Sequence, residues 1–275
     1  MYNLLFSKYT LINNKFLLGV IFMSKETKYF FSIIFITCFI GYSITIPLTN
    51  LGVLKFGSPI FMIFYAISGY SPAIAGILTV KKYYSKDTFI NFLKSCINIK
   101  RKFSEYNYIL ITILILWTTP FIVIRFFENK YILLTYPLIY LLWIFPFMIF
   151  GGGLEEIGWR GFLLPKLLEK YCPLKSSILL GIIWSIWHFP LWFVLGSNQE
   201  AINFLPFAFT CIASSFVLTF VYLKFNNIWL CILFHALDNS CSYIFKYSVD
   251  MHIIISISTA IVGYLIFHIS YKYIK

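Results

Sequence analysis

The chain has 275 residues, of which 60% are hydrophobic and only 12% are charged, and its formal net charge is +12. This composition excludes a water-soluble globular domain, because such domains carry about twice that share of charged residues. It predicts instead a polytopic helical membrane protein whose apolar side chains are covered by lipid. The positive charge is typical of cytoplasmic loops at an anionic leaflet, and no nucleic-acid-binding motif suggests another partner.

The first 28 residues predict a weakly structured N-terminal extension, because the apolar run at 17–23 is too short to span a membrane and no cleavage site follows it. Residues 29–272 then form a single transmembrane domain of the all-α class. We expect about eight spanning helices, each near the ~20 residues that a bilayer requires. They are placed at 29–49, 59–80, 107–126, 131–150, 176–195, 203–223, 227–246 and 252–271.

Two shorter stretches look interfacial. Residues 81–106 are basic and only moderately apolar, which predicts an amphipathic surface helix and a loop. A second interfacial helix is expected over 155–172, ending before Pro173.

The distribution of Lys and Arg predicts the orientation of the chain. If the N-terminus is cytoplasmic and eight crossings follow, 18 of the 22 basic residues lie on the cytoplasmic side. The remaining four, on the outer side, are Lys55, Arg125, Lys130 and Lys246. So strong a positive-inside bias predicts that both termini are cytoplasmic.

An acidic pair, Glu155 and Glu156, follows the Gly151–Gly153 run at the end of the fourth predicted span. Charge is costly in a bilayer, so such a pair is a functional-site hypothesis. Arg160 lies four residues after Glu156 and on the same helical face, which favours an ion pair between them. Glu155 is offset by about 100° around the helix and is left for the chemistry.

Two further spans within the motif-bearing core, residues 131–246, carry polar groups at helical spacing. Trp184 and His188 are four residues apart, as are His235 and Asn239, so each pair shares a face. Judged by their distance from the predicted cytoplasmic helix ends, we expect the acidic pair and these groups to line one cytoplasm-facing cavity. Asp238 lies on another face and is expected to be structural.

This set of side chains fits hydrolysis. The predicted catalytic residues are Glu155, Glu156, His188, His235 and Asn239, with Arg160 and Trp184 as support. A poorly hydrated carboxylate can act as general base on water, and His235 with Asn239 can stabilise an oxyanion. Glu155, His188 and His235 also suit a divalent metal such as zinc, with Asn239 as a weak fourth ligand. Both versions stay open, because neither an HExxH motif nor a nucleophile elbow is present.

The three motifs resemble those of the CPBP family of intramembrane proteases, which includes the type II CAAX prenyl protease and bacterial Abi proteins linked to bacteriocin self-immunity. The matching residues are Glu155-Glu156 with Arg160, an aromatic residue before His188, and His235 with Asn239. The resemblance implies a membrane endopeptidase acting on a peptide, metal-dependent or of the glutamate type. The second motif usually opens with Phe, whereas here it opens with Trp184.

The resemblance does not imply a prenylated substrate, because the Lys-, Asn-, Ile- and Phe-rich composition suggests an AT-rich bacterial genome and hence a bacterial cytoplasmic membrane. Two other function classes compete with proteolysis: a transporter or proton-coupled carrier that uses the Glu and His groups, and a non-catalytic immunity protein. Each polar pair also has a structural interpretation, as an interfacial salt bridge or as polar contacts between helices.

Overall fold

The computed structural model describes residues 24–127, 133–246 and 251–271, so residues 1–23 of the predicted extension lie outside the described part. The first described helix, α2 (Lys25–Asn50), begins before the expected boundary at residue 29. Ser24 explains the early start, because its hydroxyl accepts a hydrogen bond from the Thr27 backbone N–H at 3.3 Å and caps the helix.

The second predicted span is a bent pair of helices, α3 (Pro59–Gly69) and α4 (Ser71–Tyr83), which differ in direction by 45°. The short helix α5 (Lys86–Cys96) follows, in the stretch predicted to be amphipathic, and it buries only Cys96. The long apolar helix α6 (Phe103–Phe127) then runs the length of the bundle.

The fourth predicted span is broken at its glycines. A 3-10 turn, η1 (Leu138–Tyr140), leads into α7 (Leu141–Phe150), and the chain turns at Gly151 and Gly152. Four short helical pieces continue from there: η2 (Gly153–Glu155), α8 (Glu156–Gly158), the π-helical η3 (Trp159–Leu163) and α9 (Leu164–Leu168). Gly152 has φ +156°, which few residues with a side chain adopt.

This region differs from the expected interfacial helix over 155–172. Trp159, Arg160, Phe162 and Leu164 are all buried inside the bundle, and α8 packs against α4 and α12. The physical reason is that Glu156 pairs with Arg160 and His235, and Glu155 accepts a hydrogen bond from Trp184, so these charged groups have partners inside the protein.

The C-terminal half contains α10 (Pro173–His188), its 3-10 continuation η4 (Phe189–Phe193), the turn η5 (Gln199–Ala201) and the long helices α11 (Phe204–Phe225), α12 (Ile228–Ile244) and α13 (His252–Tyr271). Two two-residue strands, β1 (Leu133–Leu134) and β2 (Phe245–Lys246), pair antiparallel beside α6 and α12. Asn226, in a left-handed conformation, and Asn227, which caps α12, make the tight turn between α11 and α12.

Among the described residues, six helical stretches are long and apolar enough to cross a membrane, and the bent pair α3–α4 makes a seventh. α12 is apolar but has only 17 residues, at the lower limit for a span. Each of the eight predicted segments therefore overlaps a helix, although the fourth becomes helical only from Leu138 onward. The chain is an all-α, multi-pass membrane protein.

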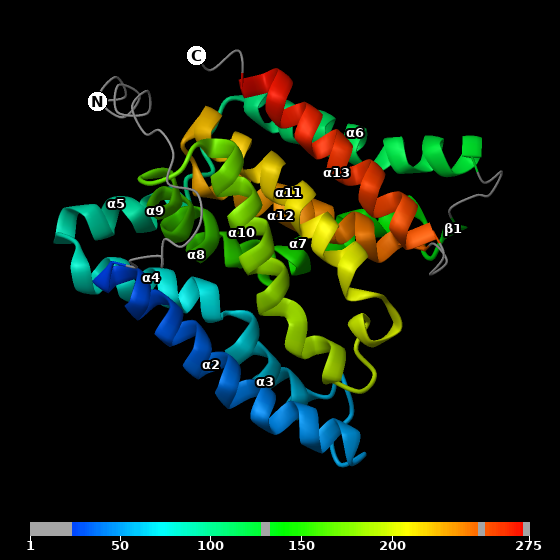
Figure 1. Cartoon of the computed structure of the whole chain (residues 1–275), viewed down its shortest axis with the longest axis horizontal. Coiled ribbons are helices and arrows are strands. Elements are labelled where there is room, and N and C mark those ends of the chain that lie inside the picture. The colour runs from blue at the N-terminus through cyan, green and yellow to red at the C-terminus, as the bar shows by residue number, and fades with distance from the viewer. Residues whose placement is uncertain (1–23, 128–132, 247–250, 272–275) are drawn as a thin grey trace, which may run out of the picture.

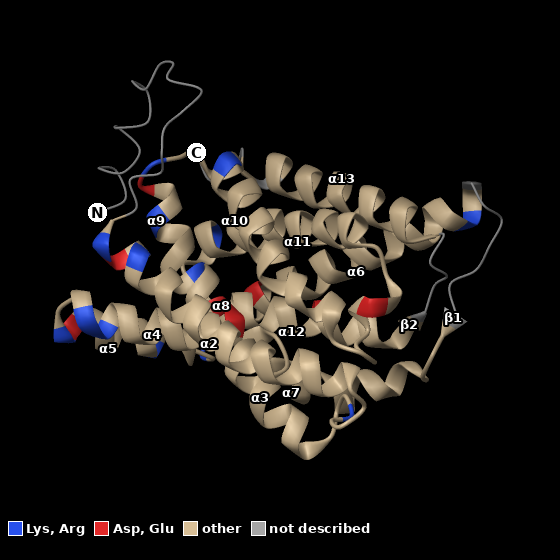
Figure 2. Ribbon diagram, turned by 60° about the horizontal axis from the view of Figure 1, so that its bottom comes forward, with Lys and Arg blue, Asp and Glu red and all other residues tan. Residues whose placement is uncertain are grey.

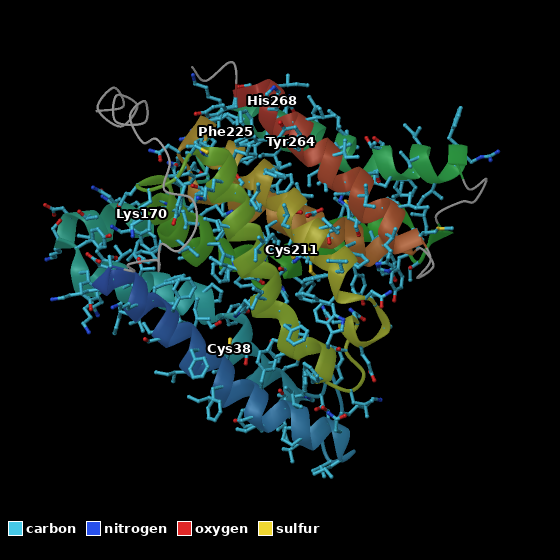
Figure 3. All side chains as sticks on the ribbon, in the orientation of Figure 1. Cys38, Lys170, Cys211, Phe225, Tyr264 and His268 are labelled. Carbon is cyan, nitrogen blue, oxygen red and sulfur yellow. The ribbon has the colours of Figure 1, made fainter. Side chains whose placement is uncertain are left out.

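The bundle has two ends of different chemistry. Lys and Arg gather around α5, α9 and the beginning of α2, as Figure 2 shows, and Lys170 lies in this region in Figure 3. The main core fills the bundle near this basic end, with Phe30, Leu164, Leu180 and Leu230 fully buried. α11 packs against α10, α12 and α13 near the centre of the bundle.

Candidate active site

Glu155 ends η2, immediately after the glycine turn, and only 8% of its surface is exposed. Its Oε2 accepts a hydrogen bond of 2.9 Å from the indole Nε1–H of Trp184 on α10. Trp184 was predicted to support the site because its ring lies one helical turn from His188. In the structure it also holds the Glu155 carboxylate, which a phenylalanine at this position would not do because it has no N–H.

Glu156 is fully buried and joins two partners. Its Oε1 lies 2.8 Å from Nδ1 of His235, and its two oxygens lie 3.1 and 3.0 Å from Nη1 of Arg160. The ion pair with Arg160 was predicted, whereas the contact with His235 was not, because nothing in the sequence relates residues 79 positions apart. Glu156 does not line the cavity described below, so it acts on the site through His235.

His188 is oriented by its own helix. Its Nδ1 lies 2.9 Å from the carbonyl oxygen of Trp184, which can only accept, so Nδ1 carries the proton. In the neutral ring, Nε2 is then an acceptor. Trp187 packs edge-on against the imidazole, with the ring centroids 4.5 Å apart.

His235 and Asn239 lie one turn apart on α12, and the glycine turn approaches them closely. A β-carbon placed on Gly152 would lie 2.2 Å from Nδ2 of Asn239 and 3.2 Å from Nε2 of His235. Because Glu156 occupies Nδ1, a neutral His235 presents an acceptor at Nε2. It can donate from this atom only as the imidazolium, so the predicted role of His235 in stabilising an oxyanion requires a protonated ring.

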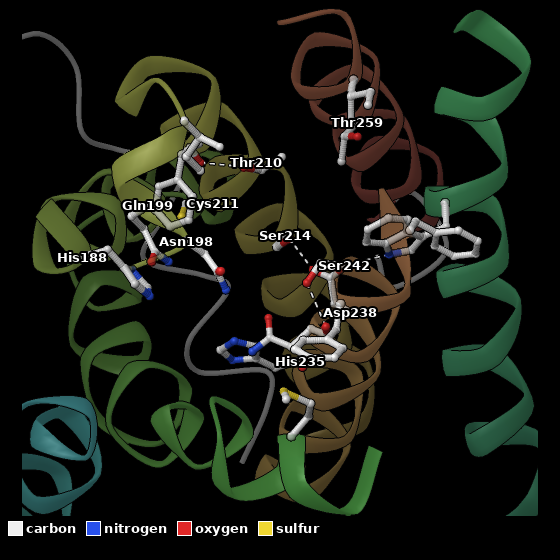
Figure 4. A pocket seen from close by; sticks show the side chains of 18 of the residues that line it. His188, Asn198, Gln199, Thr210, Cys211, Ser214, His235, Asp238, Ser242 and Thr259 are labelled. Atoms are coloured by element: carbon white, nitrogen blue, oxygen red, sulfur yellow. Dashed lines mark hydrogen bonds between the residues drawn. The ribbon is translucent and has the colours of Figure 1, made fainter. Parts of the chain in front are cut away.

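A cavity of about 770 Å³ brings the predicted residues together, and Figure 4 shows part of its lining. Glu155, Trp184, His188, His235 and Asn239 all contribute to its wall. They come from η2, α10 and α12, which are three separate segments of the bundle. A smaller cavity of about 100 Å³ between α3 and α7 also reaches Glu155 and His188.

The large cavity extends from these residues toward the end of the bundle that carries few basic residues. Its remaining wall includes Trp117 and Phe121 in the second half of α6, Asn198 in the loop after η4, and His252 at the beginning of α13. These parts of α6 and α13 and the loop after η4 lie away from α5 and α9, where Lys and Arg gather. This differs from the expectation of a cavity that opens toward the lysine-rich, cytoplasmic side.

Asp238 belongs to the cavity wall but is already bonded. Its Oδ1 accepts from Nε1 of Trp117 at 2.9 Å, and its Oδ2 accepts from Oγ of Ser214 at 2.8 Å. The carboxylate therefore ties α12 to α6 and α11, which agrees with the structural role expected for it. Neither partner was predicted, because a single Trp or Ser in an apolar helix gives no signal in the sequence.

The predicted metal set is not assembled. Within the part of the chain that the structure describes, no three His, Cys, Asp or Glu side chains lie close enough together to hold a metal ion. The Nδ1 atoms of both histidines are hydrogen-bonded, one with a carbonyl and one with Glu156, which leaves each Nε2 available, as in histidines that bind a metal. It is the spacing of Glu155, His188 and His235, and not their bonding, that does not fit a zinc site in this arrangement.

Comparison with known proteins places these residues in a recognised context. A family model described as "Type II CAAX prenyl endopeptidase Rce1-like" matches residues 137–241, a segment that contains every predicted site residue. A curated protein of Methanococcus maripaludis named "CAAX prenyl protease 2" is 38% identical over 99 residues. That alignment covers 34% of this chain and 36% of the relative, so the chain matches about a third of the relative's length.

Proposed function

We propose that the chain, whose residues 137–241 match the type II CAAX prenyl endopeptidase Rce1-like model, is an intramembrane endopeptidase of the CPBP family. It hydrolyses a peptide bond in the cavity formed by η2, α10 and α12, with a water molecule activated by Glu155. One observation carries the proposal: the carboxylate, both imidazoles and the carboxamide line a single cavity.

The proposed reaction uses the contacts of each side chain. The Glu155 carboxylate, positioned by Trp184, takes a proton from water while the water oxygen attacks the carbonyl carbon of the substrate. Nε2 of His188 accepts the second water hydrogen in a hydrogen bond and so orients the attack. The C–N bond then breaks, and the proton on Glu155 passes to the departing amine.

The negative charge on the substrate oxygen is stabilised from α12. The Asn239 amide donates a hydrogen bond to it, and His235 donates a second one when it is protonated. The Glu156 carboxylate on Nδ1 supports the imidazolium form and fixes the direction of the ring. In this scheme Glu156 is a positioning residue, and Arg160 keeps its carboxylate in place.

Peptide-bond hydrolysis is proposed without a requirement for a prenyl group. The word "prenyl" belongs to the descriptions of the family model and of the relative. The family model matches residues 137–241, and the alignment covers 36% of the relative. The proposed location is the cytoplasmic membrane of a bacterium, and the proposed biological role is bacteriocin processing or self-immunity. The lipid bilayer and a membrane-associated peptide are the proposed partners.

Glu155→Gln tests the proposal because it removes the base while keeping the shape of the side chain. Membranes from cells producing the native protein should contain new peptide N-termini, detected by mass spectrometry, that are absent with Glu155→Gln. Glu169→Gln is the matched control, since Glu169 lies in an exposed pair with Lys166 away from the cavity. The native pattern of N-termini should persist in this control.

Identical N-termini with and without Glu155 would overturn the proposal. Glu155-dependent solute flux into proteoliposomes, without peptide cleavage, would establish a transporter instead. Protection against a bacteriocin that survives Glu155→Gln would establish a non-catalytic immunity protein.

A further inference from the structure

The interior of the bundle is packed at the basic end and hollow at the opposite end. At the basic end, apolar side chains fill the interior, and Trp159, Leu163 and Leu180 are at most 1% exposed. No residue of this layer lines the large cavity. Within the described part of the chain, the large cavity that contains Glu155 therefore does not extend through this layer to the lysine-rich end.

The other end is hollow. The large cavity is lined there by connecting segments as well as helices, including Thr135 before α7 and Asn198 after η4, and both side chains are exposed. Glu155 lies at the inner part of this lining and Asn198 at the connecting loop. The mouth of the cavity is thus formed by the loops that precede α7 and α11.

Charge decides which side of the membrane this mouth faces. The predicted topology assigns 18 of the 22 Lys and Arg residues to the cytoplasmic side. Those of them that the structure describes, apart from the buried Arg160, lie on the segments at the basic end. Each such residue near an anionic surface contributes roughly 1 kcal/mol, so a difference of this size fixes the orientation. The loops at the cavity mouth belong to the opposite end, where α6 ends and α13 begins.

We infer that the cavity opens on the outer face of the membrane, so that the substrate is a peptide segment presented from outside the cytoplasm. The peptide part of this inference rests on the proposed protease function, whereas the direction of access does not. The expected cytoplasm-facing cavity and the expected cytoplasmic termini cannot both hold in this fold, and the charge distribution favours the termini.

The cavity wall indicates the chemistry of that peptide. Among the described residues, no Lys or Arg side chain lines the cavity. Its wall combines aromatic rings, such as Trp117, Tyr136 and Phe245, with the hydroxyl and amide groups of Thr135 and Asn198. Such a surface suits an apolar segment that is neutral or cationic, because the carboxylates of Glu155 and Asp238 would repel an acidic one.

Thiol labelling in intact cells tests the direction of access without any need for cleavage. Cys172 is an exposed native thiol between α9 and α10, at the basic end. Cys96, Cys211, Cys231 and Cys241 are buried, and burial raises the pKa of the Cys96 thiol to about 12, which keeps it protonated and unreactive. Cys172→Ser measures the background from the remaining thiols.

The reporter is Asn198→Cys in the Cys172→Ser protein, treated with a membrane-impermeant maleimide. It should be labelled in intact cells, whereas native Cys172 should be labelled only after permeabilisation. Thr135→Cys serves as a second reporter at the same mouth, because only its backbone N–H is hydrogen-bonded, to the Ile244 carbonyl. A cytoplasmic thiol protein in the same cells verifies that the membrane is sealed.

Labelling of both reporters only after permeabilisation, with Cys172 labelled in intact cells, would overturn the inference. A failure of proteolysis leaves these labelling results unchanged, so the two proposals fail separately. When cleavage is present, an apolar peptide added to right-side-out vesicles should be cut, and the same peptide added to inside-out vesicles should not. The reverse result would also overturn the inference.

Discussion

Trp184 connects more of the site than any other side chain. It donates to Glu155 at 2.9 Å, its ring centroid lies 5.0 Å from that of His235, and the Arg160 guanidinium lies 5.2 Å from the ring. The sequence could predict that an aromatic residue lies one turn from His188. It could not predict the hydrogen bond to Glu155, because that contact depends on how α10 packs against η2.

Trp184→Phe should lower kcat by about 10- to 100-fold, because a hydrogen bond to a charged group contributes roughly 1.5–3 kcal/mol. KM should change little, since the indole N–H faces the carboxylate rather than the substrate. Trp229→Phe is the control, because Trp229 makes a comparable bond to Tyr106 at the basic end. Equal losses in both variants would show that Trp184 is merely structural.

Glu156→Gln should destabilise the protein by about 3–5 kcal/mol, because it leaves the buried Arg160 charge without its counter-ion. Replacing both residues, as Glu156→Gln with Arg160→Met, should recover much of this loss. Thermal unfolding in detergent measures both effects. A double variant less stable than Glu156→Gln alone would contradict the interpretation as a charge pair.

Chelation tests the metal version. Since Glu155, His188 and His235 do not form a metal site as they lie, purified protein dialysed against a chelator is expected to keep its activity. Elemental analysis of the same sample gives the metal content directly. Activity lost on dialysis and restored by zinc would show that these side chains rearrange around an ion.

At the scale of elements, the site depends on close packing between helices. α4 and α8 approach so closely that a β-carbon on Gly158 would lie 2.1 Å from the Pro72 carbonyl oxygen. This contact helps to place Glu155 and Glu156, which directly precede it in the chain. The contact of Gly158 with α4 could not be predicted from the sequence, because it depends on how the two helices pack in the fold.

Gly158→Ala should lower the free energy of unfolding by about 1–3 kcal/mol, because the added methyl group forces α4 away from α8. Gly69→Ala is the matched control, since nothing lies within 4 Å of its added β-carbon, and alanine is the better helix former. Thermal unfolding of both variants makes the comparison. A native-like Gly158→Ala would show that this contact can relax without cost.

The sequence predicted the apolar helices better than it predicted the segment after Gly153. Hydropathy located the apolar helical segments, because a bilayer requires about 20 apolar residues for a span. Among the described residues, six of them are long enough to cross a membrane, and the bent pair α3–α4 makes a seventh. The segment after Gly153 was misplaced at the membrane surface, since its charges suggested water. In the fold, Glu156, Arg160 and His235 neutralise one another in the interior, and such a contact between distant segments has no local signature.

At the scale of the whole molecule, the cavity has a mouth that can be blocked. A bulky maleimide attached to Asn198→Cys, in the Cys172→Ser background, should abolish cleavage because it fills the route to Glu155. The same reagent on native Cys172 should leave activity unchanged, since this thiol lies at the closed end. Peptide cleavage by purified protein before and after labelling provides the measurement, and full activity with a modified Asn198→Cys would refute this route.

The packed layer of Trp159, Leu163 and Leu180 carries a consequence for what proteolysis achieves. A polypeptide that is cut on the cavity side of this layer does not release either fragment into the compartment at the basic end. Both fragments return to the side from which their parent came, or remain in the lipid. The cut would therefore change the composition of one face of the membrane rather than send a message across it.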